Sequence, residues 1–208
     1  ACAGCANTPL ERPSSCCTSR SDTPSNSLNA LLIQTVPEKD RGESPLDGIR
    51  FTDQHGIRHG QDDLMGKPLA LSFIYTRCEN PARCPAVTRT MIEFQKRVDG
   101  SAIGSKANVA MVSFDPEFDN PDRLAVYANA YGIKQDSRLL LLVPDLPSGA
   151  EFFRRIKMPV NYEKSGRPNG HGTLLLLLDK QGRIAERHQV VLGDVVSLVE
   201  SLAALAKE

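Results

Sequence analysis

Two cysteines in the body of the chain, Cys78 and Cys84, have the type and the spacing to carry chemistry. Five residues, with the sequence ENPAR, separate them. Two neighbouring thiolates can cycle between a dithiol and a disulfide, or they can bind a soft metal such as Cu(I). Arg77 and Arg83 flank the pair, so we expect a positive potential that favours the thiolate form. A plain structural disulfide, or two unrelated core cysteines, is the alternative interpretation.

The elements around the two cysteines place them at a strand-to-helix junction. Residues 69–75 form an almost continuous apolar run, which is typical of a strand covered on both faces. Residues 86–98 carry apolar side chains at helical spacing, and Pro85 suits the start of that helix. Cys84 is then expected at a helix N-terminus, where free N–H groups favour a thiolate. Ligands bind at this edge of doubly wound sheets, which favours a functional pair.

The rest of the chain alternates strands with helices. A short hairpin is expected first, and a closing antiparallel hairpin and a helix are expected last, with an irregular segment between residues 143 and 173. The expected strands are 49–52, 57–59, 109–114, 139–143, 173–178 and 183–187, and the other helices are 121–131, capped by Asn120, and 193–206. This order indicates the α/β class, with a thioredoxin-like three-layer sandwich around a central mixed sheet.

His171 is the candidate third ligand for a metal. It lies in the loop of residues 168–172, which runs into the expected strand 173–178. In a thioredoxin-type sheet, the segment that enters this strand returns next to the cysteine loop. One imidazole and two thiolates form an S₂N set, which suits trigonal Cu(I), or Cu(II) with an added ligand. Glycines on both sides of the histidine would let it engage and release. A solvated loop histidine is the alternative.

The composition excludes two classes of protein. The chain has 208 residues, and its 25 Lys and Arg balance its 25 Asp and Glu. Proteins that bind nucleic acids, and proteins that bind membrane surfaces through basic clusters, normally carry an excess of positive charge, which this chain lacks. No apolar run approaches the ~20 residues of a membrane-spanning helix.

Residues 1–45 differ in composition from residues 46–208. They are rich in Ser, Pro, Asn and Thr, and we expect them to form a flexible tail with at most one helical turn, followed by a single domain. Four cysteines lie in this tail: Cys2, Cys5, Cys16 and Cys17. Because the chain begins with Ala, we expect that an upstream segment has been removed.

The small residues before Cys2 and Cys5 look like the cleavage site of a bacterial lipoprotein. This interpretation places the protein on the periplasmic or extracytoplasmic face of the bacterial cell envelope, attached to the membrane by its N-terminal tether only. A tail whose cysteines have no role is the alternative.

Four motifs, in this order, carry a resemblance to a known family. They are GKP at 66–68, FIYTRC at 73–78 with Cys84-Pro85, SFDPEFDNP at 113–121, and His171 eight residues before the DKQG turn at 179–182. With these motifs, residues 46–206 resemble the Sco/SenC proteins. These are thioredoxin-like copper proteins that assist assembly of the dinuclear copper centre of cytochrome c oxidase.

The resemblance implies that Cys78, Cys84 and His171 are ligands of copper, as Cu(I) or Cu(II). It places Asp115 on the loop after the second strand, beside the site or at a partner contact. The implied partner is the copper-centre subunit of cytochrome c oxidase, or another envelope protein with paired cysteines. The alternative function is a thiol–disulfide oxidoreductase that reduces such a partner with Cys78 and Cys84 and does not need the imidazole.

One departure from the family pattern concerns the cysteine loop. The best-known members have three residues between the cysteines, whereas this chain has five, and the longer loop relaxes the geometry of the two thiols. Residue 75 is Tyr, where peroxiredoxins have Thr or Ser three residues before their reactive cysteine, so a peroxidase is disfavoured. His55, His59 and His188 are expected to be solvated strand residues. The four methionines are expected to fill the core.

Overall fold

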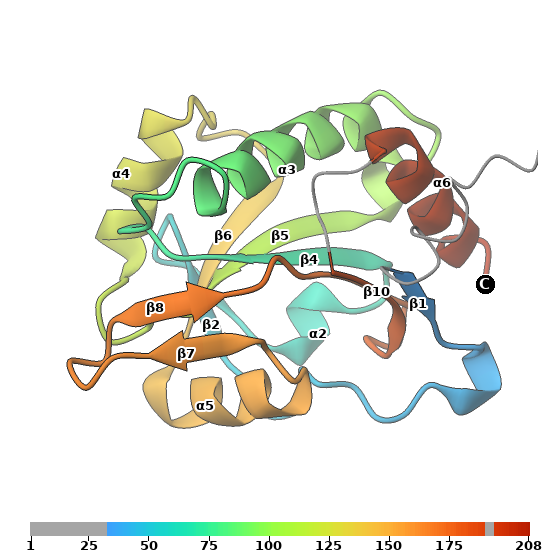
Figure 1. Ribbon diagram of the computed structural model, residues 1–208. Helices are drawn as coiled ribbons and strands as arrows, with labels where there is room; N and C mark the ends of the chain where they lie inside the picture. The colour runs from blue at the N-terminus through green and yellow to red at the C-terminus, as the bar shows by residue number, and fades with distance from the viewer. Residues whose placement is uncertain (1–32, 190–193) are drawn as a thin grey trace, which may run out of the picture.

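The computed structural model describes residues 33–189 and 194–208. Within these residues, helices cover both faces of a central sheet: α3, α4 and α6 lie on one face, and α2 and α5 lie on the other (Figure 1). The main helices are α2 (Gln61–Leu64), α3 (Cys84–Asp99), α4 (Pro121–Ala130), α5 (Leu146–Arg155) and α6 (Val195–Leu205), with short 3₁₀ turns at Glu38–Asp40 and Gly104–Lys106. This is the predicted three-layer α/β sandwich.

The central sheet is mixed. The described strands follow the order β1-β10-β9-β4-β5-β6-β2-β3, in which β4, β5 and β6 are parallel and the other pairings are antiparallel. Their bounds are β1 Ile33–Thr35, β2 Phe51–Asp53, β3 Arg58–His59, β4 Leu69–Ile74, β5 Asn108–Ser113, β6 Leu139–Pro144, β9 Leu175–Leu178 and β10 Ile184–His188. A separate two-stranded sheet consists of β7 (Val160–Tyr162) and β8 (Pro168–His171).

The register of the parallel strands places the two central loops at one edge of the sheet. All six residues of β4 are buried, as the apolar run predicts. Leu69 pairs with Asn108 and Ile74 with Ser113, so β4 and β5 end at the same level. The loop that carries Cys78 and the loop that carries Asp115 therefore leave the sheet side by side.

Helix α3 continues directly from the cysteine loop. Its buried face includes Val87, Met91, Phe94 and Val98, which recur at helical spacing and pack into the core. The residue before the helix, Arg83, gives no side-chain cap to the first N–H groups. The next helix along the chain, α4, begins as predicted, because the Asn120 side chain accepts a hydrogen bond from a backbone N–H group of the first turn.

The segment between β6 and β9 is more regular than predicted. It contains α5 and the hairpin of β7 and β8, so the prediction of an irregular segment was wrong. Pro147 and Gly149 weaken the helical pattern of α5, and a Cβ at position 149 would crowd the Pro144 ring at 3.1 Å. The short strand β8, with the sequence PNGH, lacks the β-branched residues that mark strands.

Residues 33–45, which the composition assigns to the flexible tail, contact the domain in the structure. Strand β1 pairs with β10, and Ile33 lies opposite His188. The Arg41 guanidinium forms ion pairs with Asp179 at 3.1 Å and with Glu208 at 2.5 Å. Residues 33–45 are thus attached to the domain through partners far along the chain, which a local pattern does not reveal.

The tail cysteines Cys2, Cys5, Cys16 and Cys17 and the expected lipid attachment site lie outside the described residues. Among the residues that are described, no helix has both the length and the apolar character needed to cross a membrane.

Candidate metal centre

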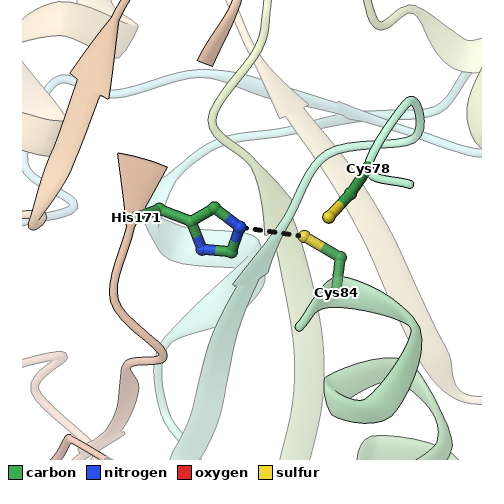
Figure 2. A group of neighbouring side chains, drawn as sticks. All are labelled: Cys78, Cys84 and His171. Carbon is green, nitrogen blue, oxygen red and sulfur yellow. Dashed lines mark hydrogen bonds between the residues drawn. The ribbon is translucent and has the colours of Figure 1, made fainter. Parts of the chain in front are cut away.

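The two cysteines and His171, which lies 87 positions beyond Cys84, meet at the edge of the sheet (Figure 2). Cys78 lies on the loop after β4, Cys84 is the first residue of α3, and His171 is the last residue of β8. Their ligand atoms all lie within 4.8 Å of one another, and the Cys84 Sγ is 3.6 Å from the His171 Nε2. Both cysteines are free thiols. The structure thus brings together the three residues that the sequence analysis singled out.

The imidazole of His171 is held in one orientation. Its Nδ1 donates a hydrogen bond to the Gly172 carbonyl at 3.0 Å, because a carbonyl oxygen can only accept. This tautomer leaves the lone pair of Nε2 directed at the Cys84 thiol. The ring packs edge-on against Tyr75 and lies 4.9 Å, centroid to centroid, from the Phe114 ring. Burial lowers the pKa of His171, so the neutral form, which is the form that binds metals, dominates at pH 7.

Burial controls the protonation of the second cysteine. Cys84 is fully buried, and this desolvation raises the pKa of its thiol well above the ordinary value, with a further contribution from neighbouring Cys78. The expectation of a low-pKa thiolate at the helix N-terminus was therefore wrong. Loss of water around the sulfur outweighs the attraction of the helix dipole. Metal binding at this position would replace a thiol proton.

The cysteine loop is organised by its own residues and attached to β8. The Asn80 side chain accepts a hydrogen bond from the Ala82 N–H at 3.0 Å, and the Asn80 carbonyl accepts one from the Arg83 N–H at 3.1 Å. The guanidinium of Arg83 donates a hydrogen bond to the main-chain carbonyl of His171. The loop that holds both thiols is thus in direct contact with the strand that holds the imidazole.

Asp115 holds the residue that precedes the first candidate ligand, Cys78. Its buried carboxylate accepts hydrogen bonds from two guanidinium nitrogens of Arg77, at 2.6 and 3.1 Å. The same guanidinium lies 4.2 Å from the centre of the Phe118 ring. The charge of Arg77 is therefore paired, and the expectation that it adds positive potential at the thiols was wrong. Asp115 instead holds the residue that precedes Cys78.

The sequence analysis missed a buried carboxylate that supports the same turn. Asp119 accepts hydrogen bonds from the Thr76 N–H at 3.1 Å and from the hydroxyls of Thr76 and Ser113. Burial raises the pKa of Asp119 in spite of these bonds. The two aspartates in the SFDPEFDNP segment were a signal for such a role, because polar groups at the end of a buried strand need partners.

Two of the other three histidines differ from the prediction of solvated residues. The Nε2 of His59 lies 2.8 Å from the Asp53 carboxylate, and the Nε2 of His188 lies 2.8 Å from the Glu186 carboxylate. His55 is exposed, as predicted. The prediction for the methionines is confirmed, because Met65, Met91, Met111 and Met158 all pack in or against the core.

Comparison with known proteins identifies the family of the chain. Residues 47–206 match the model of the SCO1/SenC family, which covers most of the chain. The protein therefore belongs to the SCO1/SenC family, in agreement with the four motifs and the thioredoxin-like fold. No curated protein sequence matches the chain.

Solved structures share the fold. BsSco, described as a member of the Sco family of cytochrome c oxidase assembly proteins with a disulfide switch, matches with a TM-score of 0.67 and 22% identity over 81% of this chain and 96% of its own. A SCO1/SenC family lipoprotein from Bacillus anthracis gives 0.65 and 24%, over 76% and 92%. Copper-bound ScoI from Bradyrhizobium japonicum gives 0.62 and 24%, over 79% and 99%.

Proposed function

We propose that this protein binds a copper ion through Cys78, Cys84 and His171 and acts as a metallochaperone, or assembly factor, for the copper centre of cytochrome c oxidase. The observation that carries the proposal is the convergence of two thiols and one imidazole within 4.8 Å. Membership of the SCO1/SenC family and the copper bound by the related ScoI support it.

The donor set fits copper better than a harder metal. Two thiolates and an imidazole suit Cu(I) in a trigonal site, and Cu(II) when a further ligand is added. The Nδ1–H of His171 is already bonded to a carbonyl, so Nε2 needs no change of tautomer to bind the ion. The aromatic rings of Tyr75 and Phe114 cover the imidazole and keep water away from that side.

The difference in exposure between the two cysteines suits a cargo ion. Cys84 is fully buried, whereas Cys78 is partly exposed on its loop. A partner with paired cysteines would therefore approach from the side of Cys78 and exchange ligands there. Copper is the cargo in this proposal, and the buried Cys84 and His171 hold it until the exchange.

The alternative function, thiol–disulfide exchange with a partner, uses the same two cysteines but is not favoured. That reaction needs a thiolate, and the pKa of the Cys84 thiol is raised by burial. It makes no use of an imidazole held beside the second thiol. Both features instead suit a metal ion, which displaces the proton as it binds.

The proposed partner is the copper-centre subunit of cytochrome c oxidase, or another envelope protein with paired cysteines. The proposed location is the extracytoplasmic face of the cell envelope, with the residues that precede β1 as a tether. The related lipoprotein from Bacillus anthracis and the Cys2 and Cys5 sequence contexts support this location.

Copper titration of the full chain tests the proposal. The four tail cysteines are first replaced by Ser, so that they do not contribute thiols. In this background we expect one tightly bound Cu(I) per chain, measured under anaerobic conditions by competition with a chromophoric chelator. Cys84→Ser should abolish tight binding. A parent chain that retains no copper after dialysis, or a Cys84→Ser variant that binds as tightly as its parent, would contradict the proposal.

A further inference from the structure

We propose that Arg83 is the positioning residue that holds the His171 imidazole against the Cys84 thiol across the longer cysteine loop of this chain. The consequence for copper affinity rests on the proposed function. The positioning itself is a property of the metal-free protein and can be tested without copper.

The first argument is the connectivity of the contact. Arg83 immediately precedes Cys84, and its guanidinium donates a hydrogen bond to the main-chain carbonyl of His171. His171 is also the residue whose Nε2 lies 3.6 Å from the Cys84 Sγ. The Arg83 side chain therefore connects the chain one residue before Cys84 to the backbone of His171.

The second argument is the weak anchoring of the strand that carries the imidazole. Strand β8 pairs with β7 alone, and this two-stranded sheet forms no main-chain ladder with the described strands of the central sheet. An isolated hairpin is marginally stable at best, so side-chain contacts must hold it in place. The Tyr162 hydroxyl donates to the Phe114 carbonyl at 2.8 Å on the β7 side, and the Arg83 contact lies at the His171 end.

The third argument is that the other contact between loop and hairpin is weaker. Glu79 and Arg167 form an ion pair at 3.4 Å between the cysteine loop and the turn of the hairpin. The Glu79 side chain is 88% exposed and that of Arg167 is 40% exposed, so solvent screens this pair. The Arg83 side chain is also exposed, but its charged donor bonds the carbonyl of buried His171, which strengthens this contact.

The five-residue spacing explains why such a residue is needed. The Asn80 turn accounts for the path of the loop, and Arg83 gives no side-chain cap to α3. Its guanidinium is therefore free to reach across to β8. A loop with more residues constrains the two thiols less. The contact from Arg83, the last residue of the loop, restores a defined position of the Cys84 thiol relative to the imidazole.

Arg83→Met removes both the donor and the charge, and Arg83→Lys tests rescue by a residue that can still donate to a carbonyl. Arg89→Met is the matched control. Arg89 is exposed, lies on α3 and reaches the same cysteine loop, at the Pro81 carbonyl, over 3.4 Å. All variants are made in the background without tail cysteines.

Two measurements are compared across these variants. In the metal-free protein, NMR of the His171 ring should give sharp signals with the proton on Nδ1 in the parent and Arg89→Met, and shifted or broadened signals in Arg83→Met. Competition for Cu(I) with a chromophoric chelator should give an affinity about 10-fold or more lower for Arg83→Met, since loss of a contact that orients a ligand costs ~10–100-fold. Arg83→Lys should recover part of this loss.

Unchanged His171 ring signals in Arg83→Met overturn the proposal, whatever the copper affinity. Changed ring signals with a copper affinity equal to that of Arg89→Met would support the positioning but overturn its proposed consequence for copper binding, because the position of the imidazole would then not matter for affinity. If the parent chain binds no copper, the proposed function fails, and the ring signals alone decide the role of Arg83. A melting temperature of Arg83→Met equal to that of Arg89→Met would show that any effect is local.

Discussion

Substitution of His171 by Phe and by Ala separates its role as a ligand from its role in packing. His171 is 9% exposed, and its ring packs against the rings of Tyr75 and Phe114, which also contact each other. Each aromatic contact contributes about 0.5–1.5 kcal/mol, so His171→Ala should lower the free energy of unfolding by about 1–3 kcal/mol. His171→Phe retains a ring and should lose only about 1 kcal/mol, with the hydrogen bond to Gly172.

Both His171 variants should lose the third copper ligand equally. Loss of a contact that merely orients a ligand costs ~10–100-fold in metal affinity, and loss of the ligand itself should exceed about 100-fold. Oxidation of the thiols to a disulfide should proceed in both variants, since Cys78 and Cys84 are intact. Urea unfolding measures the stabilities, and chelator competition for Cu(I) measures the affinities.

Two results would refute this reasoning in different ways. If His171→Phe bound Cu(I) within about 10-fold of its parent, less than the loss of an orienting contact can cost, the imidazole would not be a ligand. If His171→Ala unfolded at the same urea concentration as His171→Phe, the rings of Tyr75 and Phe114 would not depend on the imidazole, and the packing argument would be wrong.

Three further predictions follow from charges and burial elsewhere. Arg77→Met should lower the free energy of unfolding by about 2–3 kcal/mol, because buried Asp115 loses its cation; the loss is smaller than for a fully buried pair since the Arg77 side chain is 29% exposed. Adding Asp115→Asn should recover part of this loss in urea unfolding. No recovery in the double variant would argue against the ion pair. Asp53→Asn should destabilise the protein at pH 7 and much less at about pH 2–3. Burial acts to raise the pKa of the Asp53 carboxyl, but hydrogen bonds from an imidazole and two N–H groups outweigh burial and lower this pKa below 3.8. The stabilisation by Asp53 is therefore present above the unfolded pKa and is lost as pH falls through the folded pKa. If urea unfolding showed the same loss of stability in Asp53→Asn at both pH values, this reasoning would be wrong. Iodoacetamide should alkylate Cys78 at least about 10-fold faster than fully buried Cys84, and peptide mapping that finds equal rates would show that the second thiol is more open than the structure indicates.

Local patterns in the sequence predicted the elements that carry the thiols. The apolar run of β4 and the helical stripe of α3 are each set by neighbouring residues, so the strand-to-helix junction at Cys84 could be predicted. The hairpin of β7 and β8 could not, because its short strands have no clear period and are held by partners elsewhere.

The chemistry of the site was only partly predictable. The types of the three candidate ligands follow from the sequence, but the protonation of Cys84 depends on how much water reaches its sulfur, and that is a result of packing. Similarly, the pairing of Arg77 with Asp115 joins residues 38 positions apart, and it turns an expected source of positive potential into a neutral pair.

The sequence by itself determined that two thiols, with five residues between them, lie at the carboxyl end of a buried strand in a chain whose motifs are those of the SCO1/SenC family. The tertiary structure decided that His171, 87 positions from Cys84, lies with its Nε2 3.6 Å from that thiol, and that Arg83 contacts its backbone. The reason is physical: period and propensity act between near neighbours, whereas the position of a hairpin outside the central sheet depends on contacts with the whole fold.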